Sequence, residues 1–386
     1  MVARHLGPEN FGRMSYVLAF VGLCAAVVPL GLPSVLVREM VRDRASQPRL
    51  LAVAATMQAA AAALVYLAIV VLVFAVDPSS KALLILIALY GLTVLTAPAN
   101  AYRSWFEAEV KARYLVRLDM VVLGSASAAN LIAIFTGAGL PTFVAIQAAL
   151  TMSNSIGTAL IFRHVSQQSI RIAWDQSTAR YLLSQSWPLM ISAIGLIMYL
   201  KIDQVMLGRM ASAQEVGIYS AALRLSEVWY TVPMMLMSTF LPALVQAHQA
   251  DRARFDKRVE ALLDLFNGMS IVIALGVSLS ADWLVNLLFG AAYDGAGPVL
   301  ALHIWASIFL FMGTLTGPWY LVVGIQHWNI WRNFLGAGIN IGLNLWAIPI
   351  WGAWGAALAT LVSYIAANYL ADLIPSRARP LFWQKT

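Results

Sequence analysis

Apolar residues in this chain gather into eleven long blocks that are separated by short polar connections. Each block is near or above the roughly 20 apolar residues needed to cross the hydrocarbon core of a bilayer. The pattern predicts an all-α polytopic membrane protein with eleven transmembrane helices. The blocks cover residues 14–37, 50–76, 82–102, 118–135, 141–162, 187–207, 218–245, 262–289, 298–323, 331–350 and 353–374.

Positive charge is concentrated in alternate connections between these blocks. The other connections carry only Arg4, Arg13, Lys81 and Arg209. Basic connections of membrane proteins stay on the cytoplasmic side, so the asymmetry predicts a cytoplasmic C-terminus. The basic set comprises Arg38, Arg42, Arg44, Arg49, Arg103, Lys111, Arg113, Arg117, Arg163, Arg171, Arg180, Arg252, Arg254, Lys257, Arg258, Arg332, Arg377, Arg379 and Lys385.

Composition removes several classes of function. Hydrophobic residues make up 61% of the chain and charged residues 11%, against about 25% charged in soluble domains. The net charge of +7 lies in short loops beside the spans, which indicates topology signals rather than a nucleic-acid surface. The single cysteine, Cys24, and five scattered histidines predict no metal site, and no phosphate-binding glycine loop ends in Gly-Lys-Ser/Thr. We therefore expect neither a cofactor nor an enzyme, since every connection is too short to hold a catalytic domain.

Two halves of the chain carry similar motifs in the same order. Residues 9–16 (Glu-Asn-Phe-Gly-Arg-Met-Ser-Tyr) match residues 214–221 (Gln-Glu-Val-Gly-Ile-Tyr-Ser-Ala), with Gly12 and Gly217 at equivalent places. This order predicts parallel repeats: a bundle at 1–165, a cytoplasmic linker at 166–186 and a bundle at 187–386. The first bundle has five blocks and the second has six, so we expect that the first of twelve helices is missing.

The same residues resemble a known family. The segment Leu6-Gly7-Pro8-Glu9-Asn10-Phe11-Gly12, together with Asp203, Leu207-Gly208 and Glu215-Val216-Gly217-Ile218-Tyr219, resembles the polysaccharide biosynthesis proteins, the Wzx-type O-antigen flippases. The resemblance covers essentially the whole chain. It implies the MATE-like fold of the multidrug/oligosaccharidyl-lipid/polysaccharide exporter superfamily, with two bundles around a central cavity.

For function, the resemblance implies that a polyprenyl-diphosphate-linked oligosaccharide is moved from the cytoplasmic to the periplasmic leaflet by alternating access. The implied location is the bacterial inner membrane. The implied partners are that lipid-linked oligosaccharide, membrane lipids, and polysaccharide polymerase and chain-length proteins.

Charged side chains inside spans are rare and costly, which makes each of them a candidate for substrate binding. Lys201 and Arg224 are the cations that topology explains least, and a diphosphate needs cationic partners. Lys201 either binds the substrate phosphate or extends toward the outer interface. Asp203 holds a coupling cation, an arginine or a neighbouring helix. Glu227 lies three residues after Arg224, so the two either form a structural ion pair or orient Arg224 toward phosphate.

Arg38 and Arg103 end their blocks on the predicted cytoplasmic side. Each is a candidate for first contact with the diphosphate. The alternative is that each only helps to orient the chain in the membrane, since such charges occur at the same positions. Asp119 is expected to be an interfacial acid at the start of a helix rather than a proton carrier.

Two other functions remain open at this stage. A cation-coupled multidrug exporter of the same fold would favour buried carboxylates and aromatic residues over cations. A membrane-embedded polysaccharide polymerase would need a large outer loop with catalytic residues, whereas the outer connections here are short.

Overall fold

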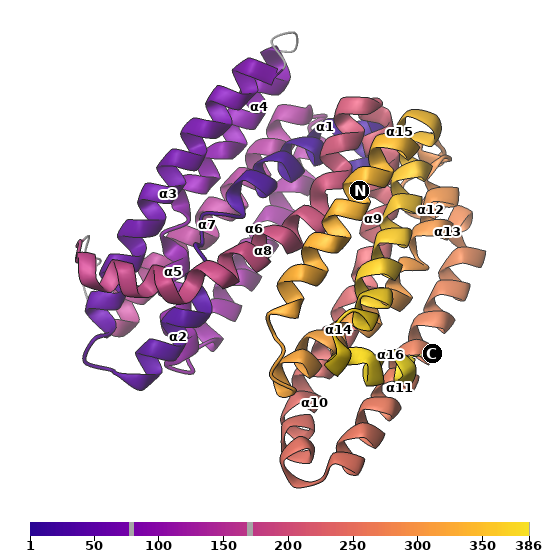
Figure 1. Cartoon of the computed structure of the whole chain (residues 1–386). Helices are drawn as coiled ribbons and strands as arrows, with labels where there is room; N and C mark the ends of the chain where they lie inside the picture. The colour runs from indigo at the N-terminus through magenta and orange to yellow at the C-terminus, as the bar shows by residue number, and fades with distance from the viewer. Residues whose placement is uncertain (77–80, 168–172, 386) are drawn as a thin grey trace. The chain divides into compact units, whose positions relative to one another are not determined.

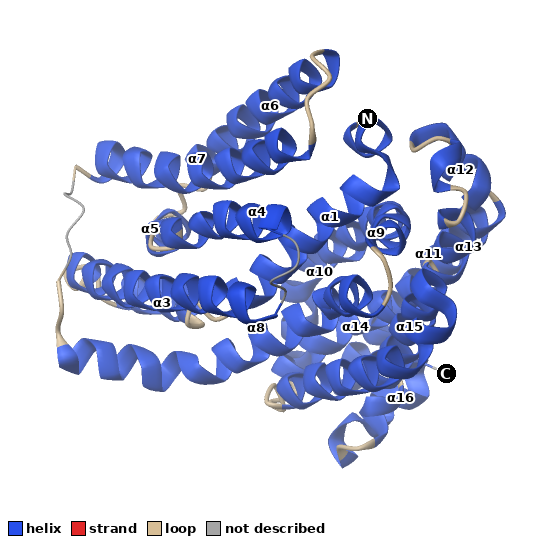
Figure 2. Ribbon diagram, turned by 90° about the horizontal axis from the view of Figure 1, so that it is seen from above, coloured by secondary structure: helices blue, strands red, loops and turns tan. Residues whose placement is uncertain are grey.

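The computed structural model describes residues 1–76, 81–167 and 173–385. Within these ranges every regular element is a helix (Figure 2). The predicted all-α class is therefore confirmed. Arg171, one of the predicted basic residues, and part of the predicted linker 166–186 lie outside the described residues.

Eight helices in the described part of the chain are long and apolar enough to cross a membrane, and a bent pair raises this number to nine. The bent pair joins 81–96 to 99–108 at 42°. The protein is therefore a multi-pass membrane protein, and its total of eleven spans stays a prediction. The eight candidates are Gln47–Val73, Arg113–Phe135, Leu140–Ser166, Gln176–Met210, Ala213–Ala250, Arg252–Leu279, Ala296–Val322 and Trp328–Leu373.

The helices form two compact units (Figure 1). Unit 1 consists mainly of Ala3–Tyr16 and Met198–Thr386, and unit 2 mainly of Val17–Ile197. Two helices, α1 (Val2–Ala25) and α8 (Gln176–Met210), contribute one part to each unit. The predicted bundles at 1–165 and 187–386 stay a prediction.

Unit 2 is built around an aromatic core. Trp105 packs edge-on against Phe106 and Phe162, and Tyr102 lies 4.6 Å from the Phe162 ring between centroids. Leu32, Leu36 and other apolar residues of α2 complete this core. The helices that lie wholly in unit 2 are α2 (Leu32–Arg42), α3 (Gln47–Val76), α4 (Lys81–Gly91), α5 (Ala99–Ala108), α6 (Arg113–Phe135) and α7 (Leu140–Ser166), with the 3₁₀ segment η1 (Leu92–Thr96).

The first predicted block, 14–37, is not one continuous helix. Helix α1 starts at Val2 and ends at Ala25, and a turn precedes α2. Leu30 and Gly31 both have positive φ (54° and 66°), which a helix interior does not accept. A Cβ on Gly31 would lie 2.4 Å from the carbonyl oxygen of Ser186, so this turn also needs glycine for close packing. The predicted boundary was wrong because apolar character continues through the turn.

Unit 1 contains most of the remaining helices. One core cluster joins Phe255 and Val259 near the start of α11 to Trp319 of α14 and to Leu381 near the C-terminus. The helices are α9 (Ala213–Glu227), α10 (Thr231–Ala250), α11 (Arg252–Leu279), α12 (Ala281–Leu288), α13 (Ala296–His303), α14 (Ala306–Val322), α15 (Trp328–Asn368) and α16 (Arg379–Lys385). The 3₁₀ segments are η2 (Val228–Tyr230), η3 (Ala291–Tyr293), η4 (Leu370–Leu373) and η5 (Ser376–Ala378).

Helix α15 reverses direction at Gly352. A straight helix of its 41 residues would be about 60 Å long, twice the hydrocarbon thickness. Gly352 has φ 55° and ψ −129°, and a Cβ on Gly355 would lie 2.3 Å from the carbonyl oxygen of Ala347. Residues eight positions apart meet only if the chain folds back. The break lies between the predicted blocks 331–350 and 353–374.

Candidate functional site

The two repeated motifs pack directly against each other in unit 1. A Cβ on Gly12 of α1 would lie 1.8 Å from the carbonyl oxygen of Ala213, and one on Gly217 of α9 would lie 1.9 Å from that of Pro8. The two backbones approach too closely for any side chain at these positions. Nearby, Gly208 gives space to the ring of Tyr16. These glycines therefore fix the crossing of α1 and α9.

Helix α9 also holds the fold-back of α15. Its N-cap residue, Ser212, accepts a hydrogen bond from the backbone N–H of Glu215 at 3.2 Å. Glu215 in turn accepts a hydrogen bond from the backbone N–H of Ala353 at 2.6 Å, at the point where α15 restarts after Gly352. A first-turn N–H has no partner within its own helix, so the Glu215 carboxylate supplies one from outside. The motif Glu215-Val216-Gly217 thus joins α1, α9 and α15.

Lys201 and Glu227 form an ion pair between α8 and α9 in unit 1. The Lys201 Nζ lies 3.3 Å from the Glu227 Oε1, and both side chains are about one-third exposed. Glu227 was predicted to pair with Arg224, on the basis of their spacing along one helix. The observed partner is Lys201, because the end of α8 brings its amine beside this face of α9.

Arg224 lies beside this pair and has a different environment. Its guanidinium carbon is 5.3 Å from the centre of the Phe11 ring on α1. This is within the range of a cation–π contact. The residue is exposed, and it makes no ion pair with any carboxylate in the described part of the chain. Lys201, Arg224 and Glu227 form what we call the cationic cluster, with two positive charges and one negative charge.

Asp203 lies on the opposite face of α8, inside the unit, and is 2% exposed. It accepts hydrogen bonds from Tyr219 of α9 (2.8 Å), from Thr360 (2.7 Å) and from Asn344 of α15 (2.6 Å). The sequence offered an arginine, a cation or a neighbouring helix as its partner. Two neighbouring helices are observed, and no cationic side chain pairs with it among the described residues. Sequence reasoning did not identify Tyr219, Asn344 and Thr360 as partners of Asp203, because they are ordinary neutral residues of apolar blocks.

The Asp203 environment contains polar atoms that lack a partner. Asn344 Nδ2 is shared between Asp203 and Asn340, while Asn344 Oδ1 and Asn340 Nδ2 are buried without any hydrogen bond in the described structure. Carboxylate, amide and hydroxyl oxygens are ligands suited to small hard cations. These residues therefore fit a proton or a small monovalent cation, with Asp203 supplying the charge.

A second buried carboxylate of unit 1 was not predicted. Asp372 and Lys385 form an ion pair at 2.5 Å, and both side chains are 0% exposed. Lys385 also donates to Thr316 (2.6 Å) and to the carbonyl of Asn368 (2.7 Å), while Tyr320 donates to Asp372. Lys385 was assigned to the basic tail that marks topology. Burial lowers its pKa to about 8, and Asp372 opposes this shift.

Arg103 and Arg38 lie in unit 2, and each has its own partner. Arg103 pairs with Asp119 at 2.8 Å, and Asn154 contacts both side chains. Asp119 is the seventh residue of α6, so the expected acid at the start of a helix is instead the partner of Arg103. Arg38 pairs with Glu39 and donates to Gln185 at 3.1 Å.

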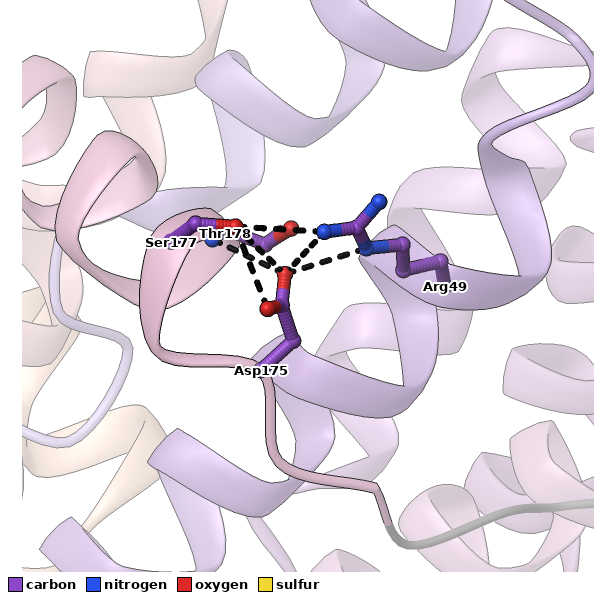
Figure 3. Close-up of polar contacts among 4 residues, drawn as sticks. All are labelled: Arg49, Asp175, Ser177 and Thr178. Atoms are coloured by element: carbon purple, nitrogen blue, oxygen red, sulfur yellow. Dashed lines mark hydrogen bonds and ion pairs between the residues drawn. The ribbon is translucent and has the colours of Figure 1, made fainter.

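The start of α8 is held by an exposed charge cluster (Figure 3). Asp175 precedes the helix and accepts from the backbone N–H of Thr178, from Ser177 and from Arg49, whose Nε lies at 3.0 Å. Thr178 first, and then Arg49, hold the pKa of Asp175 well below its usual range. This cluster lies in unit 2, and Asp175 itself comes just before the candidate span Gln176–Met210.

Comparison with known proteins gives the family. The family model described as "Polysaccharide biosynthesis protein" matches residues 1–248. Among curated proteins, the chain is 25% identical over 181 residues to the probable flippase AglR of Haloferax volcanii. That match covers 45% of this chain and 37% of the relative, so the chain spans little more than a third of the relative's length.

Solved structures show the same fold. An inward-facing multidrug resistance MATE family transporter of the MOP superfamily matches with a TM-score of 0.74 at 15% identity, over 100% of this chain and 94% of the other. The lipid II flippase MurJ in an inward closed conformation matches with a TM-score of 0.68 at 15% identity, over 98% and 86%. The chain has the MATE-like fold of these transporters, and it belongs to the polysaccharide biosynthesis protein family.

Proposed function

We propose that this protein moves a polyprenyl-diphosphate-linked oligosaccharide across the membrane by alternating access, without covalent chemistry. Family membership supports this proposal, as does the similarity to a protein named as a probable flippase. The observation that carries it is the cationic cluster of unit 1. Arg224 presents a planar guanidinium, suited to bidentate binding of phosphate, and it forms no direct ion pair with a carboxylate among the described residues.

Within the cluster, each residue has a separate proposed role. Arg224 binds the diphosphate, while the Lys201–Glu227 pair supplies a second cation when the substrate's charge competes with Glu227. Two cations against one carboxylate favour an anionic cargo. This charge balance is the reason that drug export is less favoured. Arg38 and Arg103, which are paired within unit 2, stay predictions as first contacts for substrate.

Asp203 is the proposed coupling site. A buried carboxylate surrounded only by neutral donors carries an uncompensated charge, which is costly inside a membrane protein. A bound proton or monovalent cation would neutralise it. Asp203, Tyr219, Thr360 and, after rotation of its amide, Asn344 would hold such a cation.

The proposed topology follows from the basic connections. The positive-inside rule supports a cytoplasmic position for the α10–α11 connection and for the C-terminus. The bacterial inner membrane stays the location that the family resemblance implies. Polysaccharide polymerase and chain-length proteins stay predicted partners.

The test is transport by the full chain in liposomes that contain a fluorescent lipid-linked oligosaccharide. Arg224→Ala should slow flipping at least tenfold, because one charge-assisted hydrogen bond is worth about 1.5–3 kcal/mol. Arg224→Lys should retain part of the rate. The control is Arg13→Ala, since Arg13 pairs with Glu9 on the exposed surface of α1. Unchanged flipping by Arg224→Ala, with the protein equally folded, would contradict the proposed role of the cluster.

A further inference from the structure

A small pocket in unit 1 lies apart from the cationic cluster. It has a volume of about 240 Å³ and is lined by Tyr320 of α14, by Trp328, Trp331 and Arg332 at the start of α15, and by Ala371 and Ile374 after that helix. Its mouth is apolar, because Trp331 is 66% exposed and Ile374 is 56% exposed. In a membrane protein, such a mouth is suited to hydrocarbon chains.

One positive charge in this pocket has no anionic partner among the described residues. The Nε atom of Arg332 is buried and makes no hydrogen bond in the described structure, and its Nη1 reaches only the carbonyl of Gly313 at 3.4 Å. The guanidinium carbon lies 5.8 Å from the centre of the Tyr320 ring. Buried polar groups are normally hydrogen-bonded, so a half-buried guanidinium with an N–H that lacks an acceptor is unfavourable. An anion in the pocket would accept this hydrogen bond and balance the charge of Arg332.

The nearby acid cannot fill this role. Asp372 already accepts from Tyr320 and pairs with Lys385. Arg332 and Lys385 together exceed Asp372 by one positive charge. An anion from outside the described residues would balance this charge.

The position of the pocket indicates the source of that anion. Tyr320 and Trp328 pack against the same core as Phe255, Ala378 and Leu381. The pocket therefore lies at the end of unit 1 that carries Arg254 and the other basic residues of the α10–α11 connection and the tail. Basic pockets between helices on the cytoplasmic side bind anionic lipid headgroups, and tryptophan is enriched at that interface.

We propose that this pocket binds the headgroup phosphate of an anionic phospholipid from the leaflet at the basic end of the unit. Arg332 binds the phosphodiester, and the acyl chains lie along the exposed side chains of Trp331, Leu335 and Ile374. The pocket is smaller than the roughly 300–1,000 Å³ of sites for drug-sized ligands. It therefore suits a phosphodiester rather than a diphosphate with an attached oligosaccharide.

The test measures thermal unfolding of the purified full chain, by tryptophan fluorescence in detergent, during titration with dioctanoyl phosphatidylglycerol. We expect a saturable rise in melting temperature, and at least tenfold weaker apparent binding in Arg332→Gln. Arg254→Gln, which removes an exposed arginine at the same end, should keep the wild-type response. Trp331→Ala changes an exposed residue and should weaken binding severalfold, which keeps the proposal testable if Arg332→Gln folds poorly.

Titrations with other ligands distinguish an anionic phospholipid from other molecules that carry phosphate. Dioctanoyl phosphatidylcholine and inorganic phosphate should each produce little shift. An equal rise in melting temperature with inorganic phosphate would overturn the proposal. So would a rise with polyprenyl phosphate but not with phosphatidylglycerol. An equal loss of phosphatidylglycerol binding in Arg332→Gln and Arg254→Gln would also overturn it.

Discussion

Asp203 and Asp372 are both buried carboxylates of unit 1, but their partners differ in charge. Asp372 faces the ammonium group of Lys385, whereas Asp203 faces hydroxyl and amide groups. A charge that is paired inside a protein is difficult to exchange, because removing one partner leaves the other uncompensated. A carboxylate with neutral donors can take up a proton or a cation and lose it again. The difference in partners supports a stabilising role for Asp372 and the proposed coupling role for Asp203.

The largest effect should come from breaking the charged pair. Asp372→Asn leaves Lys385 buried without an anion, and we expect a loss of about 3–5 kcal/mol in the free energy of unfolding. Thermal unfolding in detergent measures this loss as a lower melting temperature. Adding Lys385→Met to the same chain removes the stranded cation and should restore much of the stability. An unchanged melting temperature in the single variant would show that the pair is not a stabilising contact.

The next effect tests how the Asp203 environment is held in place. Gly12→Ala places a Cβ where the backbone of α9 lies, so the crossing must open and displace Tyr219, the hydrogen-bond donor on α9. We expect destabilisation of about 1–3 kcal/mol, typical of overpacking, together with slower transport. The matched control is Gly22→Ala in the same helix, since no atom lies within 4 Å of a Cβ there. Similar behaviour of both variants would show that the α1–α9 crossing does not hold Tyr219 in place.

Asp203→Asn is the counterpart of Asp372→Asn and should be much milder for stability. Tyr219 and Thr360 can rotate their hydroxyls to suit an amide, and a buried charge is removed, so the free energy of unfolding should change by less than about 1 kcal/mol. Transport in liposomes should nevertheless be abolished, because an amide cannot exchange a proton or hold a cation's charge. Normal transport, or a stability loss like that of Asp372→Asn, would reverse the assignment.

Sequence predicted the all-α class, and it marked candidate site residues because charges within apolar blocks stand out. It selected Asp203, Lys201, Arg224 and Glu227 but paired Glu227 with the wrong cation. Spacing along one helix reveals neighbours on that helix, whereas Lys201 comes from another one. The glycines that allow α1 and α9 to cross were visible as a repeat, but their contact was not.

The Asp372–Lys385 pair is a buried ion pair that the sequence did not reveal. Lys385 follows two arginines in a basic tail, and its charge alone fits topology as well as burial. Its burial depends on how α16 packs against α11 and η4. Nothing local in the sequence marks that packing. Neutral donors such as Asn344 and Thr360 are missed for a similar reason, since only the folded structure places them beside a carboxylate.

The smallest effect concerns Asp175, a partly exposed carboxylate that contrasts with both buried ones. Its pKa is held below the usual value by Thr178 and Arg49, so its contribution to stability is present above about pH 4 and is lost as the pH falls through the lowered pKa. Asp175→Ser keeps a side chain that can cap α8 but removes the titration. The melting temperature of the wild type should exceed that of this variant slightly at pH 7, and the difference should vanish on acidification. A difference that stays constant down to pH 2.5 would mean that the cap stabilises α8 by its hydrogen bonds alone, and that charge matters here only when it is buried.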